Sequence, residues 1–225
     1  MKVIADGVAQ AGGRLCGISW RSGNKRMGAS RSLGLADLAP VLTLPGFSFV
    51  NLQYGEVAAD IAALRERLGV NVQQAMGVDV FHDIDGLLAL IDLCDVVLTI
   101  DNVTAHLAGA LGKASIVLVP TGRGRYWYWG GEERSIWYPS LKLVYQEEVG
   151  AWGPGIASAA ASLPQHSGRV GSIGRPNPIG PALGRRRRLP SPRRSTWPPR
   201  ANAAAPPDIL RVDEKNIREH SIFNV

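Results

Sequence analysis

The chain has 225 residues, 45% of them hydrophobic, and a formal net charge of +6. This length suits one domain or two small ones, and no apolar run approaches the length of a membrane-spanning helix. The first residues carry one lysine but no continuous apolar core, so a signal peptide is not expected. Cys16 and Cys94 both fall in apolar segments, which favours buried thiols over a disulfide framework or a zinc site. These features predict a cytoplasmic protein.

The positive charge is concentrated at one end of the chain. Residues 1–163 hold 13 Lys and Arg against 15 Asp and Glu, whereas residues 164–225 hold 12 against 4, together with 10 of the 15 prolines. Such a composition cannot bury a core, which predicts a disordered tail with at most a weak helix over 208–217. The abrupt change also resembles a shift of reading frame. The arginine runs of the tail could contact nucleic acid, but a solvated tail is favoured because no aromatic residues are interleaved.

Short apolar runs alternate with amphipathic segments through the rest of the chain. Strands are predicted over 15–20, 47–53, 70–72, 96–100, 115–119 and 141–145, and helices over 35–44, 56–68, 84–93, 104–111 and 152–163. Pro40 must kink or restart the first helix. The alternation predicts an α/β, Rossmann-like doubly wound parallel sheet. Right-handed crossovers in such a sheet would put the first strand beside the fourth.

The segment after the fourth predicted strand is the first candidate site. Ligands of open α/β sheets bind at the carboxyl ends of strands, where the N–H groups of a helix start favour an anion. The groups that a phosphate would meet here are the amides of Val103, Thr104 and Ala105, the Thr104 hydroxyl and the His106 imidazole. The alternative is plain capping, in which Asp101 or Asn102 satisfies the helix start and His106 is a polar residue of its first turn.

A second candidate is the loop after the first strand, residues 21–32, which we call the cationic loop. Its four cations are Arg21, Lys25, Arg26 and Arg31. Arginine could hold a diphosphate through two hydrogen bonds and lysine as a point charge. Taken alone, the loop could equally be a solvated segment. The predicted strand order places it next to the turn at 101–104, which favours binding.

Residues 120–131 form a third candidate, the aromatic loop, which follows the fifth strand. Its sequence, Arg-Gly-Arg-Tyr-Trp-Tyr-Trp from residue 123, is flanked by glycines. Tyr126 and Trp127 could stack on a base or a sugar. The alternative is that these aromatic side chains fill an edge of the core or pack against a second domain.

Other chemistries find little support in the sequence. His82, Asp83, Asp85 and His106 have no dedicated metal-ligand spacing, so no metal site is expected. No nucleophile elbow and no G-x-G-x-x-G fingerprint occur in the expected context. These observations argue against a hydrolase and a dehydrogenase.

Residues 101–113, DNVTAHLAGALGK, resemble the D-x-x-T-A-H-L-A-G-A-L-G-K signature of bacterial glycosyltransferases of the heptosyltransferase-like family 9, often found at the end of tetratricopeptide-repeat proteins. Further matches are residues 17–23 (GISWRSG), 51–53 (NLQ), 85–91 (DGLLALI) and 137–140 (WYPS). The resemblance covers about residues 14–163. It therefore divides the chain into a lead segment (1–13), a domain (14–163) and the tail (164–225).

The resemblance implies a GT-B fold, of which this chain would be the carboxyl-terminal, donor-binding half. Sugar would be transferred from a nucleoside-diphosphate sugar to a protein or glycan without a metal or other cofactor. The nucleotide-sugar site would include the whole turn and helix start, from Asp101 and Asn102 to His106. Within it, Thr104, His106 and the amides of 103–105 would hold the pyrophosphate, and Arg21 and Lys25 would neutralise it. The catalytic base, expected in an amino-terminal half, is not identified. Three alternatives stay open. The chain could be a non-catalytic remnant that binds a nucleotide sugar, an unrelated flavodoxin-like or regulatory α/β domain, or a nucleic-acid protein that acts through the tail.

Overall fold

The computed structural model describes residues 13–166. All but the last residue of the predicted lead segment, and the predicted tail beyond residue 166, lie outside the described residues. The strands are β1 (Arg14–Ser19), β2 (Phe47–Asn51), β3 (Val72–Gln73), β4 (Val96–Ile100), β5 (Ser115–Val119) and β6 (Leu141–Tyr145). The helices are α2 (Gly28–Arg31), α3 (Ala39–Leu42), α4 (Ala58–Leu68), α5 (Ile84–Leu93), α6 (Val103–Ala110) and α7 (Gly153–His166), with 3-10 turns η1 (Leu35–Leu38), η2 (Gly122–Gly124) and η3 (Trp127–Trp129).

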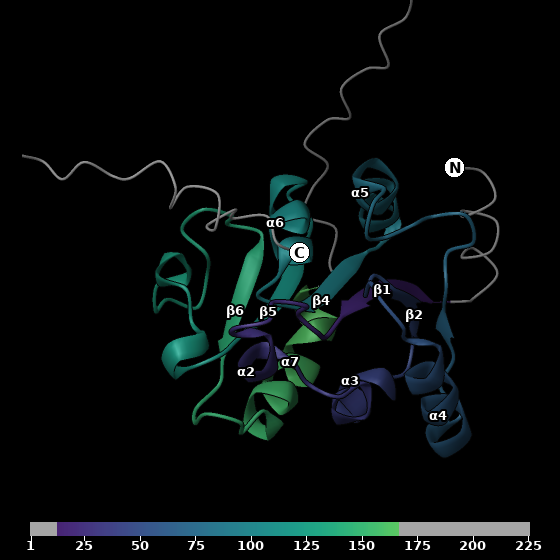
Figure 1. Cartoon of the computed structure of the whole chain (residues 1–225), viewed down its shortest axis with the longest axis horizontal. Coiled ribbons are helices and arrows are strands. Elements are labelled where there is room, and N and C mark those ends of the chain that lie inside the picture. Colours follow the sequence, from purple (N-terminus) through teal and green to yellow (C-terminus); the bar gives the residue numbers. More distant parts are fainter. Residues whose placement is uncertain (1–12, 167–225) are drawn as a thin grey trace, which may run out of the picture. The chain divides into compact units, whose positions relative to one another are not determined.

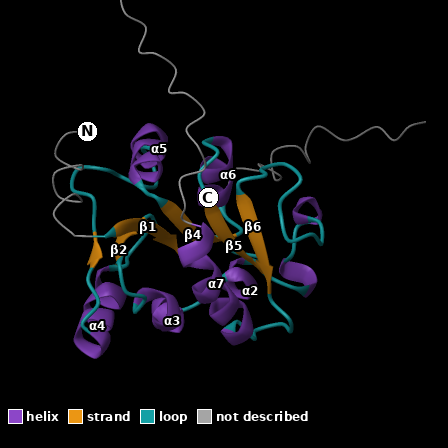
Figure 2. Cartoon of the chain, turned by 180° about the vertical axis from the view of Figure 1, so that it is seen from behind, coloured by secondary structure: helices purple, strands orange, loops and turns teal. Residues whose placement is uncertain are grey.

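The six strands form one parallel sheet in the order β3-β2-β1-β4-β5-β6. This is the doubly wound, Rossmann-like order predicted from the sequence, with the first strand beside the fourth. Figures 1 and 2 show α5 and α6 on one face of the sheet and α3, α4 and α7 on the other. The sheet is therefore covered on both faces, and every residue of β4 and β5 is buried.

The core has one cluster on each face and a third at the β5–β6 end. The largest cluster packs β1, β2, β4 and β5 against α3, α4 and α7. The opposite face packs the sheet against α5 and α6. Cys16 belongs to the first cluster and Cys94 to the second, and both are free thiols. Both side chains are buried, so the prediction of buried thiols is confirmed. Burial raises the pKa of Cys94 to about 12.

Local signals account for most element boundaries. Helix α5 and strands β4, β5 and β6 have the predicted ends. The helix predicted over 35–44 is split into η1 and α3, because Pro40 lies in the first turn of α3 and restarts the helix there. Gly69 ends α4 in the left-handed conformation, and β3 then begins later than predicted, at Val72.

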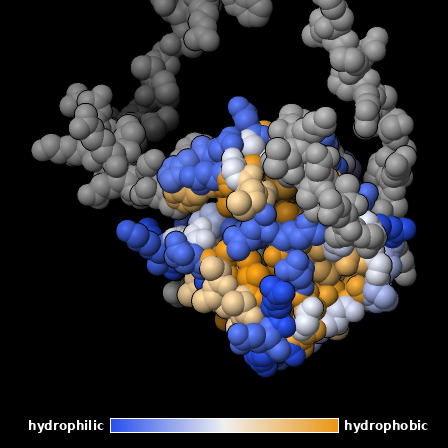
Figure 3. All heavy atoms as spheres, turned by 90° about the vertical axis from the view of Figure 1, so that its right-hand side faces the viewer, coloured by the Kyte–Doolittle hydropathy of each residue, from blue (hydrophilic) through white to orange (hydrophobic). Residues whose placement is uncertain are grey.

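The last helix extends further than predicted, and the edge strand of the sheet is short. Helix α7 continues to His166, past the predicted boundary at residue 163, and includes Pro164. The edge strand β3 has only two residues, and the surface at this end of the sheet mixes apolar and polar residues (Figure 3). Within residues 13–166, no helix has both the length and the apolar character needed to cross a membrane.

Candidate functional site

The strand order creates a switch point between β1 and β4. The chain leaves β1 toward β2 on one side and leaves β4 toward β5 on the other, while Ser19 stands opposite Thr99 in the ladder. The carboxyl ends of both strands therefore lie at one edge of the sheet. Ligands of open α/β sheets bind at this position. The cationic loop and the turn before α6 both begin here.

The start of α6 is capped by Asn102. Its side-chain oxygen accepts a hydrogen bond from the Thr104 amide at 3.0 Å, and its carbonyl accepts one from the Ala105 amide at 3.1 Å. Two of the three amides predicted for a phosphate are thus already paired, as in the capping alternative. Val103 at the tip is 38% exposed, whereas Thr104 is buried. An anion at this turn would approach through the Val103 N–H group and the amino-terminal end of the helix dipole.

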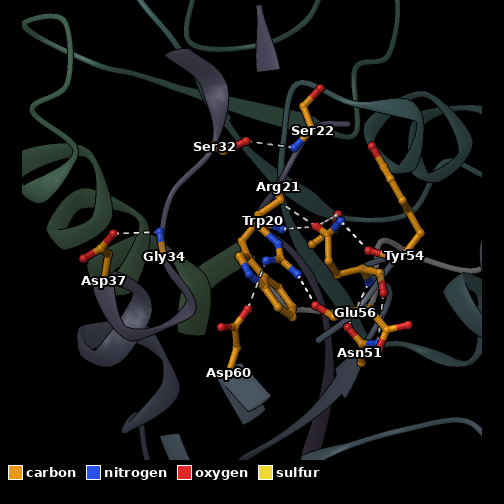
Figure 4. A network of polar contacts seen from close by, with 12 residues as sticks. Trp20, Arg21, Ser22, Ser32, Gly34, Asp37, Asn51, Tyr54, Glu56 and Asp60 are labelled. Atoms are coloured by element: carbon orange, nitrogen blue, oxygen red, sulfur yellow. Dashed lines mark hydrogen bonds and ion pairs between the residues drawn. The ribbon is translucent and has the colours of Figure 1, made fainter. Parts of the chain in front are cut away.

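A buried polar network joins the carboxyl ends of β4, β1 and β2. Asn102 donates to the Ser19 hydroxyl at 2.8 Å, and Ser19 donates to the Gln53 side-chain oxygen at 3.1 Å. That oxygen also accepts the backbone N–H groups of Trp20 at 2.9 Å and Arg21 at 2.7 Å. Figure 4 shows this region from close by. The network fixes the path of the chain as it enters the cationic loop.

Sequence reasoning did not assign a role to the network. Ser19 and Gln53 lie in two of the segments that resemble the family, 17–23 and 51–53, but the resemblance gives them no role. The available signal was a polar side chain in or directly after a buried strand, where an unpaired polar group would be costly and a hydrogen-bond partner is therefore expected.

Arg21 lies at the switch point through its backbone, while its side chain turns toward α4. Its carbonyl lies 3.5 Å from the Asn102 side-chain nitrogen. Its guanidinium donates to the Glu56 carbonyl at 2.7 Å and pairs with Asp60 at 3.2 Å (Figure 4). This differs from the prediction that the Arg21 guanidinium faces the turn. The ion pair is more than a third exposed, so breaking it costs at most about 1 kcal/mol. Lys25 and Arg26 are exposed.

Arg31 and Asp101 form a buried pair that the sequence did not predict. The Arg31 Nε and an Asp101 carboxylate oxygen are 3.8 Å apart, and both side chains are almost fully buried. Burial raises the pKa of Asp101 to about 7, and the neighbouring Arg31 guanidinium opposes this rise. Arg31 was expected to help hold a diphosphate as part of the cationic loop. It faces inward instead, because α2 turns its side chain under the aromatic loop.

His106 is surrounded by aromatic rings. Its ring stacks on Trp129 at a centroid distance of 5.2 Å and lies 5.5 Å from Tyr128 and 5.8 Å from Tyr138. Burial lowers the pKa of His106, so the ring is neutral at pH 7. It can therefore offer a ligand a hydrogen bond but no charge.

Most rings of the aromatic loop fill an edge of the core, which was one of the two alternatives that the sequence left open. Trp129 is buried against β5 and β6, and Tyr126 and Tyr128 pack beside it at the edge of the core. Trp127, in contrast, is 80% exposed. Of the two residues predicted to stack on a base or a sugar, Tyr126 is engaged with Arg31 and Trp127 projects into solvent. Within residues 13–166, no group of three or more His, Cys, Asp or Glu side chains could hold a metal ion.

The strand order and the switch point define a Rossmann-like, doubly wound α/β domain. No family model matches the chain. Over 148 residues the chain is 37% identical to Protein FlbA of Caulobacter vibrioides; the match covers 65% of this chain and 24% of FlbA, so the chain spans about a quarter of that protein's length. Among solved structures, the chain is similar to a glycosyl transferase family 9 protein from Veillonella parvula, with a TM-score of 0.44 and 14% identity over 64% of this chain and 39% of that chain.

Proposed function

We propose that the domain binds a nucleoside-diphosphate sugar at the carboxyl edge of the sheet between β1 and β4, as the donor-binding half of a glycosyltransferase. The observation that carries the proposal is the contact between the two candidate segments. The Asn102 side chain, which caps α6, bonds to Ser19 and reaches the Arg21 carbonyl, so the cationic loop begins beside the helix start. The resemblance of residues 101–113 to the family 9 signature supports the same ligand.

The electrostatics of this edge suit a diphosphate. The amino-terminal end of α6 contributes partial positive charge. Lys25 and Arg26 are exposed, and Arg21 can leave Asp60 at little cost. These groups would stabilise the charge that develops on a leaving diphosphate, which is why we propose transfer without a metal.

We propose that the domain binds the donor but does not itself supply the general base. Among residues 13–166 we assign no such base near the switch point, and the chain spans about a quarter of the length of FlbA. We propose that a second half supplies the base and the acceptor site, and that the acceptor is a protein or a glycan. Without that half, the domain would bind the nucleotide sugar and not transfer it.

The test is calorimetric titration of the full chain with UDP-, GDP- and ADP-sugars at about 0.15 M salt, which limits long-range attraction by the other cations of the chain. The variant Lys25→Ala/Arg26→Ala should weaken binding about tenfold, because two charges near the diphosphate are lost. The matched control, Arg65→Ala/Arg67→Ala on α4, removes the same charge from exposed positions elsewhere and should bind as the wild type does. Absence of binding by every nucleotide sugar, or equal weakening in both variants, would refute the proposal.

A further inference from the structure

The Arg31 guanidinium joins segments that are far apart in the sequence. Its Nε is 3.8 Å from a carboxylate oxygen of Asp101, and its Cζ lies 3.8 Å from the centre of the Tyr126 ring. Arg31 ends α2 in the cationic loop, Asp101 lies in the turn before α6, and Tyr126 lies in the aromatic loop. One buried side chain therefore contacts all three segments at the carboxyl edge of the sheet.

The polar atoms of this pair are poorly satisfied. Within residues 13–166, Arg31 Nε and Nη2 and both carboxylate oxygens of Asp101 have no hydrogen-bond partner. Charges buried in this way are costly unless an opposite charge or an aromatic face balances them. Here the carboxylate and the Tyr126 ring provide that balance. Such an arrangement contributes little to stability but specifies one placement of the groups it joins.

The aromatic loop has few backbone bonds to the rest of the domain. Its backbone–backbone bonds are local: Arg125 to Gly122, Trp129 to Tyr126 and Gly130 to Trp127. Its first residues are held by the Thr121 N–H, which donates to the Gln146 side chain at 3.3 Å, and by the Arg125 guanidinium, which lies 4.8 Å from the centre of the Tyr145 ring. The far end is anchored by the Tyr145 hydroxyl, which donates to the Trp129 carbonyl at 2.8 Å.

The first half of the loop rests on α2. A Cβ added to Gly124 would come within 2.8 Å of the Ser30 hydroxyl oxygen, so backbone and helix are in direct contact beside Arg31.

A series of aromatic contacts connects Tyr126 to α6. Tyr126 stacks on Tyr128 at 5.1 Å, with an interplanar angle of 18°. Tyr128 in turn contacts Trp129 at 5.3 Å and His106 of α6 at 5.5 Å. These contacts therefore connect Arg31 through the aromatic loop to α6, and Asp101, just before α6, connects the start of this helix back to Arg31.

We propose that Arg31 is a positioning residue: its buried guanidinium, held between Tyr126 and Asp101, fixes the aromatic loop against the turn before α6. Only arginine suits this place, because a planar guanidinium can lie on a ring with one face and present an edge to a carboxylate, whereas a lysine ammonium is a point charge.

A second part of the proposal rests on the proposed function. The fixed loop forms one wall of the nucleotide-sugar site, so loosening it lowers affinity.

The first part is tested by hydrogen–deuterium exchange with peptide mass spectrometry on the full chain. In Arg31→Met/Asp101→Asn both charges are removed, so no buried ion is left unpaired and the domain should stay folded. Amides of residues 122–130 should exchange about tenfold faster, while peptides from β4 and β5 should be unchanged. Arg31→Lys should show the same local increase, because charge without a planar group does not restore the contact.

The matched control removes another ion pair of similar length. Lys113→Met/Asp92→Asn eliminates a 3.6 Å pair that lies outside the three joined segments, and exchange of residues 122–130 should then match the wild type. Unchanged exchange of this segment in Arg31→Met/Asp101→Asn, an equal increase throughout the domain, or full rescue by lysine would overturn the positioning role.

The second part is tested by titrating the same variants with the nucleotide sugar that the wild type binds. Arg31→Lys should raise the dissociation constant about fivefold. A loosened loop with unchanged affinity would overturn the assignment of the loop as a wall of the site. If the wild type binds no nucleotide sugar while the exchange result holds, the proposed function fails and the positioning role stands.

Discussion

Asp101 is a carboxyl group whose protonation depends on the fold. It lies between β4 and α6, with its carboxylate buried beside Arg31 and the indole of Trp129. Desolvation disfavours the carboxylate, while the charge of the neighbouring Arg31 favours it. Desolvation prevails, and the pKa of Asp101 rises to about 7. The group consequently titrates close to neutral pH.

This raised pKa makes stability depend on pH. Between about pH 4 and pH 7 folded Asp101 holds a proton that the unfolded chain releases, so its contribution to the free energy of unfolding falls as pH rises through this range. Between pH 5 and pH 8 the free energy of unfolding of the wild type should fall by on the order of 2 kcal/mol more than that of Asp101→Asn, as measured by urea denaturation.

Glu133 provides the control for that experiment. It is exposed, and the hydrogen bond with Lys142 lowers its pKa, so in Glu133→Gln the free energy of unfolding should fall between pH 5 and pH 8 as much as in the wild type. A wild type and an Asp101→Asn variant with parallel pH dependence would show that Asp101 has an ordinary pKa.

Among the elements, α6 shows how small residues bring a helix close to its neighbours. Ala105 and Ala108 are fully buried, the former beside β5 and β6 and the latter with α5. Gly109 faces Tyr138, whose ring also contacts His106. The absence of a side chain at Gly109 thus lets the segment before β6 cover the helix.

Gly109→Ala tests this packing. An added Cβ would lie 2.4 Å from the Tyr138 Cγ, so the ring must move. Overpacking costs about 1–3 kcal/mol and the better helix propensity of alanine returns about 1 kcal/mol, so a net loss on the order of 1 kcal/mol is expected in thermal denaturation. Gly153→Ala, where an added Cβ meets no atom within 4 Å, should be neutral or slightly stabilising. Equal effects in the two variants would contradict a tight contact with Tyr138.

For the described domain as a whole, the switch point is also the seam between two halves of the sheet. Strands β3, β2 and β1 lie on one side of it and β4, β5 and β6 on the other. Besides the β1–β4 ladder, the Asn102 side chain crosses this seam to Ser19, which in turn donates to Gln53 on the β2 side. The placement of the cationic loop relative to α6 depends on these bonds.

Gln53→Met should weaken the network that supports Ser19 beside this seam. The substitution keeps the volume but leaves the Trp20 and Arg21 N–H groups and the Ser19 hydroxyl without their acceptor. Buried donors left unpaired cost about 1–3 kcal/mol each, so a loss on the order of 3 kcal/mol is expected in urea denaturation. Gln73→Met on the edge strand β3, where the side chain is half-buried, is the matched control and should change stability by less than about 0.5 kcal/mol. Similar losses in both variants would contradict the role of Gln53.

The sequence by itself determined the six strands, the longer helices and their order, but not the short helix α2 within the cationic loop. Apolar runs such as 96–100 and 115–119 are local patterns, and their alternation with helices, together with the handedness of crossovers, predicted β1 beside β4. The capping role of Asn102 was one of two alternatives, because a cap and an anion site use the same amides.

Only the tertiary structure decided which charged groups meet. Four cations follow one another in the cationic loop, yet Arg21 turns to Asp60 and Arg31 turns inward to Asp101, 70 residues away. Tyr126 and Trp127 are likewise adjacent in the chain but differ in burial. Strands and helices follow from interactions between near neighbours in the chain. The direction of a long side chain depends on desolvation and on partners that only the packed domain brings together.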